Sequence, residues 1–196
     1  MTVAYLVVVG LALGFSLTIP PGPMNALIAM RSVRSLKGGI TTGFGAMTAD
    51  LVLGVLVYAL HSLVDLDPIV RWVEAAGAVV MASFAYRVLT REAREVPPDP
   101  TPDVRVFSEA LLLGVTNPFQ VIWWLTAGLA FAYLGGAWLL GGLFGAIAIW
   151  IVAFPLVLYH TVRRSAKLPR SVALASGLLL AGFAVYFAWL ATGLSV

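Results

Sequence analysis

The sequence contains no cysteine and few charged residues. The absence of cysteine excludes disulfides, thiolate metal sites and dithiol redox chemistry. Charged residues make up only 11% of the 196 residues and hydrophobic residues make up 61%, whereas a soluble domain is about 25% charged. A water-facing fold needs more charge than this chain has, so we expect an integral membrane protein.

The apolar residues come in blocks of about 20, the length a helix needs to cross about 30 Å of hydrocarbon. No Lys or Arg precedes the first block, so we interpret it as a retained helix and not as a cleavable signal. The pattern predicts an all-α fold in which residues 1–196 form one membrane domain. Charged or turn-rich breaks divide the chain into six spans, at 3–30, 39–63, 69–89, 107–133, 136–161 and 172–193.

The distribution of Lys and Arg predicts how these spans are oriented. Every basic residue except Arg71 lies in or beside the first, third or fifth loop, and such loops face the cytoplasm. Both termini are then external in a multi-pass protein of the cell membrane. The formal charge of +3 reports this topology and does not indicate a nucleic-acid partner.

Helix breakers recur in the two halves of the chain. Pro21 recurs as Pro118 and Gly38-Gly39 recurs as Gly135-Gly136 at one common spacing, and Gly77 recurs as Gly177 at a slightly longer one. We therefore predict two repeats, 1–95 and 105–196, joined by a Pro-rich linker at 91–106. Because each half holds three spans, the second repeat is inverted, as in many secondary transporters.

The first span is interrupted at Thr18-Ile19-Pro20-Pro21-Gly22-Pro23, because a helix cannot continue through this run of prolines. The break lies about 16 Å along a helix from the basic Arg31, near the middle of the membrane. Either the prolines only bend a long helix for packing, or the open backbone lines a water-filled cavity.

The fourth span has a matching break at Asn117-Pro118, about 12 Å along a helix from Glu109. Two breaks at similar depth favour one shared cavity. A new half-helix follows each break, and such N-termini attract anions. The amides expected to be free are those of Met24, Asn25 and Ala26 after the first break and of Phe119, Gln120 and Val121 after the second.

Asp50 is the deepest acidic residue of the sequence, near the centre of the second span. A charge at this depth costs at least about 2.5 kcal/mol, so such residues usually face a cavity and bind ions, protons or substrate. The alternative is that Asp50 caps freed amides at a break. Thr18 and Thr48 are candidate hydroxyl ligands, unless each bonds its own helix backbone. We interpret His61 and His160 as interfacial.

Small residues repeat at a spacing that lets helices approach closely. We interpret them as interior packing, with a homodimer face as the alternative. The pairs are Gly10/Gly14, Gly39/Gly43 and Gly141/Gly145.

Three segments together resemble the lysine exporter (LysE/RhtB) family of amino-acid exporters. Pro21-Gly22-Pro23 with Asn25 resembles the Pro-Gly-Pro signature of that family. Gly45-Ala46-Met47-Thr48-Ala49-Asp50 is similar to its second span and Asn117-Pro118 to its fourth. Met24 and Phe119 depart from the polar residue and the Lys common at those positions. The resemblance implies export of amino acids or similar small metabolites, driven by the proton gradient.

An amino acid carries a carboxylate and an ammonium, and the expected site offers a half-helix N-terminus for one and Asp50 for the other. Protonation of Asp50 from outside would release the ammonium, which predicts proton antiport. The sequence predicts no cofactor, no resident metal and no enzyme activity. The alternatives are a divalent cation exporter using Asp50 and backbone carbonyls as ligands, a membrane-embedded enzyme, and a passive assembly subunit. The candidate binding residues are Thr18, Pro21, Gly22, Pro23, Asn25, Thr48, Asp50, Asn117, Pro118 and Gln120.

Overall fold

The computed structural model describes residues 2–60, 67–92, 103–162 and 168–192. These residues form eight α-helices and two π-helical turns, with no strand among them. Most of the expected linker at 91–106, and His61, lie outside the described residues. The first half contains α1 (Val3–Thr18), α2 (Pro23–Arg34), α3 (Leu36–Leu60), α4 (Asp67–Arg87) and the π-turn η1 (Val88–Glu92). The second half contains α5 (Asp103–Val115), α6 (Pro118–Trp123), the π-turn η2 (Trp124–Gly128), α7 (Leu129–Val162) and α8 (Leu168–Ala191).

Three described helical stretches are long and apolar enough to cross a membrane, Leu36–Leu60, Gly136–Thr161 and Arg170–Trp189. The bent pair of α1 and α2 makes a fourth if the two helices are one span. The prediction of an all-helical membrane protein is confirmed at this level.

The first predicted break is present between α1 and α2. The two helices meet at an angle of 77°, and Gly22 between them has an extended backbone. Pro23 begins α2, a position where its missing N–H and fixed φ suit a helix start. The prolines therefore end one helix and start the next in a new direction.

The second predicted break is present between α5 and α6. α5 ends at Val115 and α6 begins at Pro118. Asn117 caps α6, because its side chain accepts a hydrogen bond from the Phe119 amide. An Asn-Pro pair thus both ends one helix and starts another.

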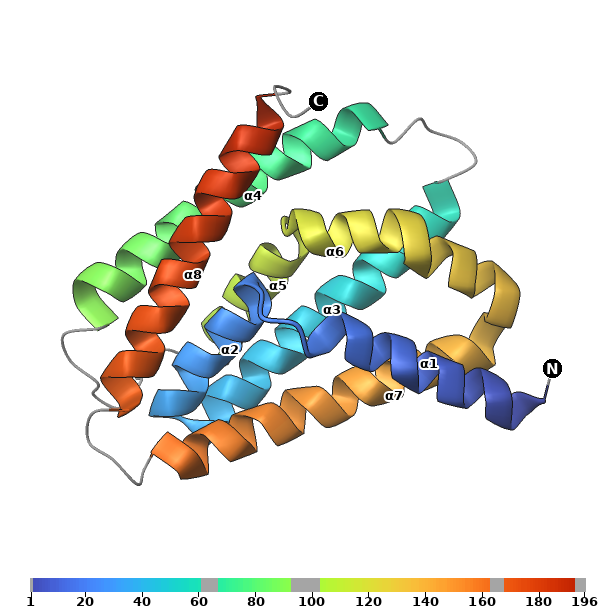
Figure 1. Cartoon of the computed structure of the whole chain (residues 1–196), viewed down its shortest axis with the longest axis horizontal. Coiled ribbons are helices and arrows are strands. Elements are labelled where there is room, and N and C mark those ends of the chain that lie inside the picture. The colour runs from blue at the N-terminus through green and yellow to red at the C-terminus, as the bar shows by residue number, and fades with distance from the viewer. Residues whose placement is uncertain (1, 61–66, 93–102, 163–167, 193–196) are drawn as a thin grey trace.

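The chain reverses at Gly136, inside the element α7. Gly136 has a φ of 52° and ψ of −146°, and such a positive φ is readily adopted by glycine. The predicted boundary between the fourth and fifth spans is therefore a sharp reversal within α7 and not a separate loop (Figure 1).

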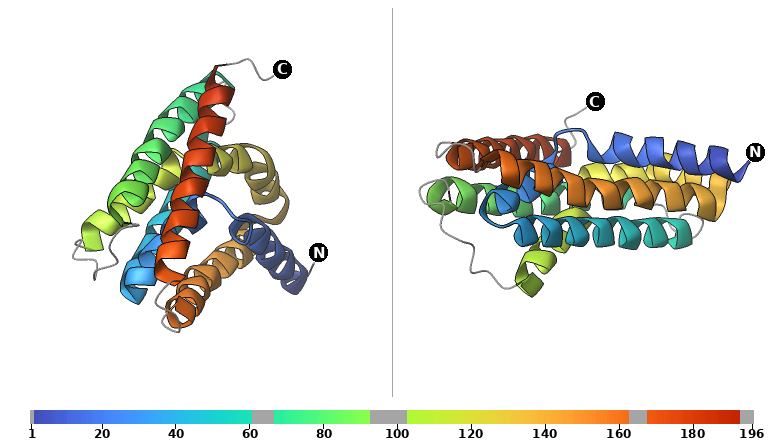
Figure 2. Two further views of the ribbon diagram at one scale, coloured as in Figure 1. Left: turned by 60° about the vertical axis from the view of Figure 1, so that its left-hand side comes forward. Right: turned by 90° about the horizontal axis from the view of Figure 1, so that it is seen from below.

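The helices pair in a crossed pattern between the two halves. α1 lies along α7 and α4 lies along α8 (Figure 1), and Figure 2 shows these two pairs from two further directions. α5 packs against α3. Gly10 and Gly14 contact the backbone of α7, while Gly45 contacts α5 in the same manner. Each half therefore packs the first helix of its broken span on the other half.

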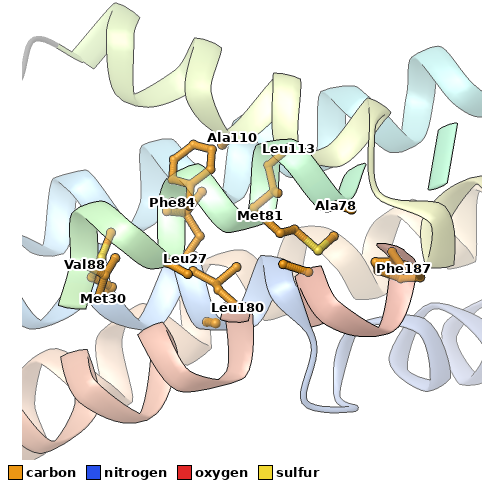
Figure 3. Packing of buried hydrophobic residues seen from close by; sticks show 13 residues of the cluster. Leu27, Met30, Ala78, Met81, Phe84, Val88, Ala110, Leu113, Leu180 and Phe187 are labelled. Carbon is orange, nitrogen blue, oxygen red and sulfur yellow. The ribbon is translucent and has the colours of Figure 1, made fainter. Parts of the chain in front are cut away.

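A cluster of buried apolar side chains joins α2, α4, α5 and α8 (Figure 3). Leu27 and Met30 come from α2, and they meet Met81 from α4, Leu113 from α5 and Leu180 from α8. The half-helix α2 is thus held by both halves of the chain, close to the first break.

The small-residue pairs differ in their surroundings. Gly10/Gly14 and Gly39/Gly43 have close neighbours on other elements, which confirms interior packing for them. Gly141 has no atom within 4 Å of where a Cβ would stand, and at Gly145 only Leu11 comes that near. The prediction of interior packing was wrong for Gly141, because it lies on a side of α7 that no other described helix covers.

Candidate functional site

A cavity of about 350 Å³ lies where the two broken helices meet. We call it the Asp50 cavity. Residues from α1, α2, α3, α6, α7 and α8 line it. Among the predicted site residues, its lining includes Thr18, Pro21, Gly22, Pro23, Asn25, Asp50, Asn117 and Gln120.

Asp50 projects from α3 into this cavity and is only 4% exposed. Its Oδ1 accepts hydrogen bonds from Gln120 Nε2 and Trp124 Nε1, each at 3.0 Å. No described residue donates a hydrogen bond to its Oδ2. One carboxylate oxygen is therefore held by α6 and η2, while the other is left for whatever enters the cavity.

A short chain of hydrogen bonds positions Gln120. Asn117 Nδ2 donates to Gln120 Oε1 at 3.1 Å, so that the Gln120 amide nitrogen is turned toward Asp50. Asn117 Oδ1 accepts from the Phe119 amide at 3.2 Å. Asn117 thus caps α6 and also orients Gln120, the side chain that donates a hydrogen bond to Asp50. These bonds connect the second break to the acid on α3.

Asn25 braces the first break. Its Nδ2 donates to the Thr18 carbonyl at 2.5 Å and to the Pro20 carbonyl at 2.9 Å. Its Oδ1 accepts from Trp150 Nε1 on α7 at 3.0 Å. These bonds satisfy carbonyls that lose their helical donors at the prolines. Asn25 therefore serves the backbone first and offers the cavity little free hydrogen-bonding capacity.

Three of the amides expected to be free at the breaks have acceptors, so that expectation was wrong for them. Ala26 N donates to the Gly22 carbonyl at 2.9 Å and Val121 N to the Asn117 carbonyl at 3.1 Å. Phe119 N bonds the Asn117 side chain. In each case but Phe119 the acceptor is the carbonyl of the N-cap residue, which accepts the first intrahelical bond of a helix. The amides of Met24 and Asn25 have no acceptor among the described residues.

Two predicted site residues, Thr48 and Pro118, do not line the cavity. The Thr48 hydroxyl donates to the Phe44 carbonyl at 2.8 Å. It therefore bonds its own helix backbone, which was the alternative to a role as a hydroxyl ligand. Thr18, which does line the cavity, also bonds its own helix, at the Gly14 carbonyl. Pro118 packs against Gly77, where a Cβ would lie 2.8 Å from Pro118 Cδ. Pro118 therefore shapes the second break from outside the cavity.

The aromatic residues of the site were not predicted from the sequence. Neither Trp124 nor Trp150 was among the predicted site residues, yet their indole N–H groups donate hydrogen bonds to Asp50 and Asn25. The spacing carried a signal, because Trp124 follows Gln120 by four residues and so shares its helix face. No comparable signal marks Trp150, which reaches Asn25 from a distant helix.

The walls of the cavity are mostly apolar. Phe119 packs edge-on against Phe183, with ring centroids 5.2 Å apart, and Met24 also lines the space. Among the described residues, Asp50 is the only ionisable one in the lining. No group of three His, Asp or Glu residues that could hold a metal occurs in the described part of the chain. The site suits one cationic group attached to an apolar body better than a divalent cation.

Comparisons with known proteins identify a family and several relatives. A family model described as LysE type translocator matches residues 15–190, which confirms the resemblance seen in the sequence. Leucine efflux proteins of Salmonella choleraesuis (strain SC-B67) and Salmonella typhi are 29% identical over 117 residues. Those matches cover 56% of this chain and 55% of each relative, so the chain matches about half the length of these curated relatives. No solved structure matches the chain.

Proposed function

This chain belongs to the LysE type translocator family, and from that premise we propose that it exports amino acids with apolar side chains from the cytoplasm by proton antiport. The observation that carries the proposal is a single acid among the described lining residues, Asp50, with one oxygen open to a cavity whose walls are mostly apolar. Leucine is the first candidate, since the similar Salmonella proteins are named for leucine efflux.

The two ends of an amino acid find different partners in the cavity. The ammonium pairs with Asp50 Oδ2, while Gln120 and Trp124 hold the other oxygen in place. The carboxylate lies at the start of α2, where the Met24 and Asn25 amides and the positive end of the helix dipole favour an anion. An apolar side chain then fits against Phe119 and Phe183.

Proton coupling follows from the same carboxylate. A protonated Asp50 has lost the charge that attracts the ammonium, so a proton from outside and the substrate exclude each other at one site. Since no other acid of the described chain lines the cavity, both partners compete for Asp50. One proton enters for each amino acid released.

We further propose the six-span topology with two inverted repeats, 1–95 and 105–196, linked through 91–106, and with both termini outside the cell membrane. The crossed pairing of α1 with α7 and of α5 with α3 supports it, because symmetry-related helices then have symmetry-related partners. A homodimer is part of the proposal as well, with the uncovered Gly141 of α7 on its face.

A substrate panel in proteoliposomes tests the function. With an inward proton gradient, we expect efflux of leucine to exceed that of lysine or glutamate at least about tenfold, because a second charge has no partner in the cavity. The efflux rates of labelled leucine, lysine, glutamate and Mn²⁺ are compared in the same vesicles. Vesicles that transport Mn²⁺ or lysine but not leucine would contradict the proposal. A leucine flux that does not depend on the pH gradient would contradict it as well.

A further inference from the structure

Trp124 lines a second cavity, which we call the distal cavity, and is hydrogen-bonded to the acid of the Asp50 cavity. The distal cavity has a volume of about 410 Å³ and lies along the C-terminal half of α3, near the reversal at Gly136. The indole of Trp124 is part of its wall, and the indole Nε1 donates to Asp50 Oδ1 at 3.0 Å. One side chain thus connects the acid of the first cavity to the wall of the second.

The ring of Trp124 rests on two glycines. A Cβ on Gly54 of α3 would lie 2.8 Å from the Trp124 ring, and one on Gly128 would lie 2.6 Å from it. Phe144 of α7 stacks on the same ring at a centroid distance of 6.2 Å. The indole is therefore held by apolar contacts on its faces and by one polar contact, at Asp50.

The backbone at Trp124 is also unusual. Trp124 is the first residue of the π-turn η2, which ends at Gly128. Such turns are rare and often occur at functional sites. The turn joins α6, which carries Gln120, to the part of α7 that leads to Gly136. A change at η2 would move Trp124 without disturbing the cap at Asn117.

We propose that Trp124 is the gate between the two cavities and that its indole N–H senses the charge of Asp50. This inference rests on the proposed function of the Asp50 cavity. The indole donates to a carboxylate, and hydrogen bonds to ionised groups are about twice as strong as neutral ones. When a proton or the substrate ammonium neutralises Asp50, that bond weakens and the ring is released toward the distal cavity.

The distal cavity suits this movement. Its lining is apolar apart from Tyr58, and it includes Leu51, Val55 and Leu140, so the released ring meets surfaces like those it left. The two cavities then become continuous along α3, toward the end of the molecule that the charge pattern places outside. Neutralising Asp50 thereby opens the route through which the amino acid leaves.

The test compares Trp124→Phe with Trp138→Phe in proteoliposomes. Trp124→Phe keeps an aromatic ring on Gly54 and Gly128 but removes the donor to Asp50. Trp138 is 57% exposed on α7 and lies outside both cavity linings, so its substitution is the matched control. With equal pH on both sides and no external leucine, we expect leucine to leak from Trp124→Phe vesicles about tenfold faster than from the wild type, as loss of a hydrogen bond to a charged group predicts.

A second variant displaces the gate without changing Trp124. Gly54→Ala places a methyl group against the indole, whereas Gly182→Ala on α8 meets no atom within 4 Å. We expect the leak in Gly54→Ala and none in Gly182→Ala. Leak rates equal to the wild type in both Trp124→Phe and Gly54→Ala would overturn the gate. If wild-type vesicles export no leucine, the proposed function itself fails; if they export it and neither variant leaks, only the gate does.

Discussion

Replacing Asp50 by asparagine is expected to abolish proton-driven export while the protein still folds. Asparagine keeps the size of the side chain and an acceptor oxygen for Gln120 and Trp124. In the wild type, the donor nitrogens of these two residues lie 3.0 Å from Asp50 Oδ1. A neutral amide at this depth costs less to bury than a carboxylate. The substitution removes the group that binds the ammonium and the proton in turn, so uphill transport should fall to background and its pH dependence should flatten.

Efflux from proteoliposomes at several imposed pH gradients measures this effect. Asp103→Asn is the control, because Asp103 is exposed and lies on α5 outside the cavity. A well-folded Asp50→Asn protein that still exports leucine uphill would refute the coupling role. A variant that does not fold would favour the structural alternative, in which Asp50 mainly satisfies Gln120 and Trp124.

The second large effect is expected at Glu109, where replacement by glutamine should destabilise the protein by about 3 kcal/mol, as for other buried ion pairs that lose one partner. Glu109 on α5 accepts from Arg31 of α2 at 2.7 Å and from Arg87 of α4 at 2.9 Å. The Arg31 side chain is only 5% exposed, so it loses this carboxylate in a setting with little water. Arg105 joins the same carboxylate at 3.2 Å but is largely exposed.

Asp103→Asn again provides a matched control, since Asp103 pairs with Lys37 and both side chains are at least half exposed. Such pairs contribute less than about 1 kcal/mol. Thermal unfolding in detergent should show a lower midpoint for Glu109→Gln than for Asp103→Asn. Equal midpoints would show that the contacts between Glu109 and the two arginines do not hold α2, α4 and α5 together.

The sequence was enough to place the two breaks and the acid between them. Prolines at Pro20 and Pro21 must end a helix because of their own covalent structure, whatever surrounds them. The position of Asp50 near the middle of α3 likewise follows from counting residues along a span. These features are local, so one sequence suffices to find them.

Contacts between residues far apart in the chain could not be predicted from the sequence in this way. Trp150 reaches Asn25 across the bundle, and Glu109 gathers arginines from two other helices. Neither arrangement leaves a periodic mark on the sequence. The reversal at Gly136 was placed correctly, but the free amides were overcounted because the carbonyls of Gly22 and Asn117 act as acceptors.

The most direct test of the account is protection of a single thiol in the Asp50 cavity. The chain has no cysteine, so Ala46→Cys introduces the only thiol. Ala46 lines the cavity and lies one helical turn before Asp50, on the same face of α3. Ser108→Cys, on α5 outside the cavity lining, is the control.

Leucine at about ten times its Kd should slow alkylation of Ala46→Cys about tenfold, as simple occupancy predicts. Alkylation of Ser108→Cys should not change, and the protection should be lost when Asp50→Asn is added to Ala46→Cys. If leucine leaves the alkylation rate of Ala46→Cys unchanged, or slows both thiols equally, the amino acid does not bind between the two broken helices.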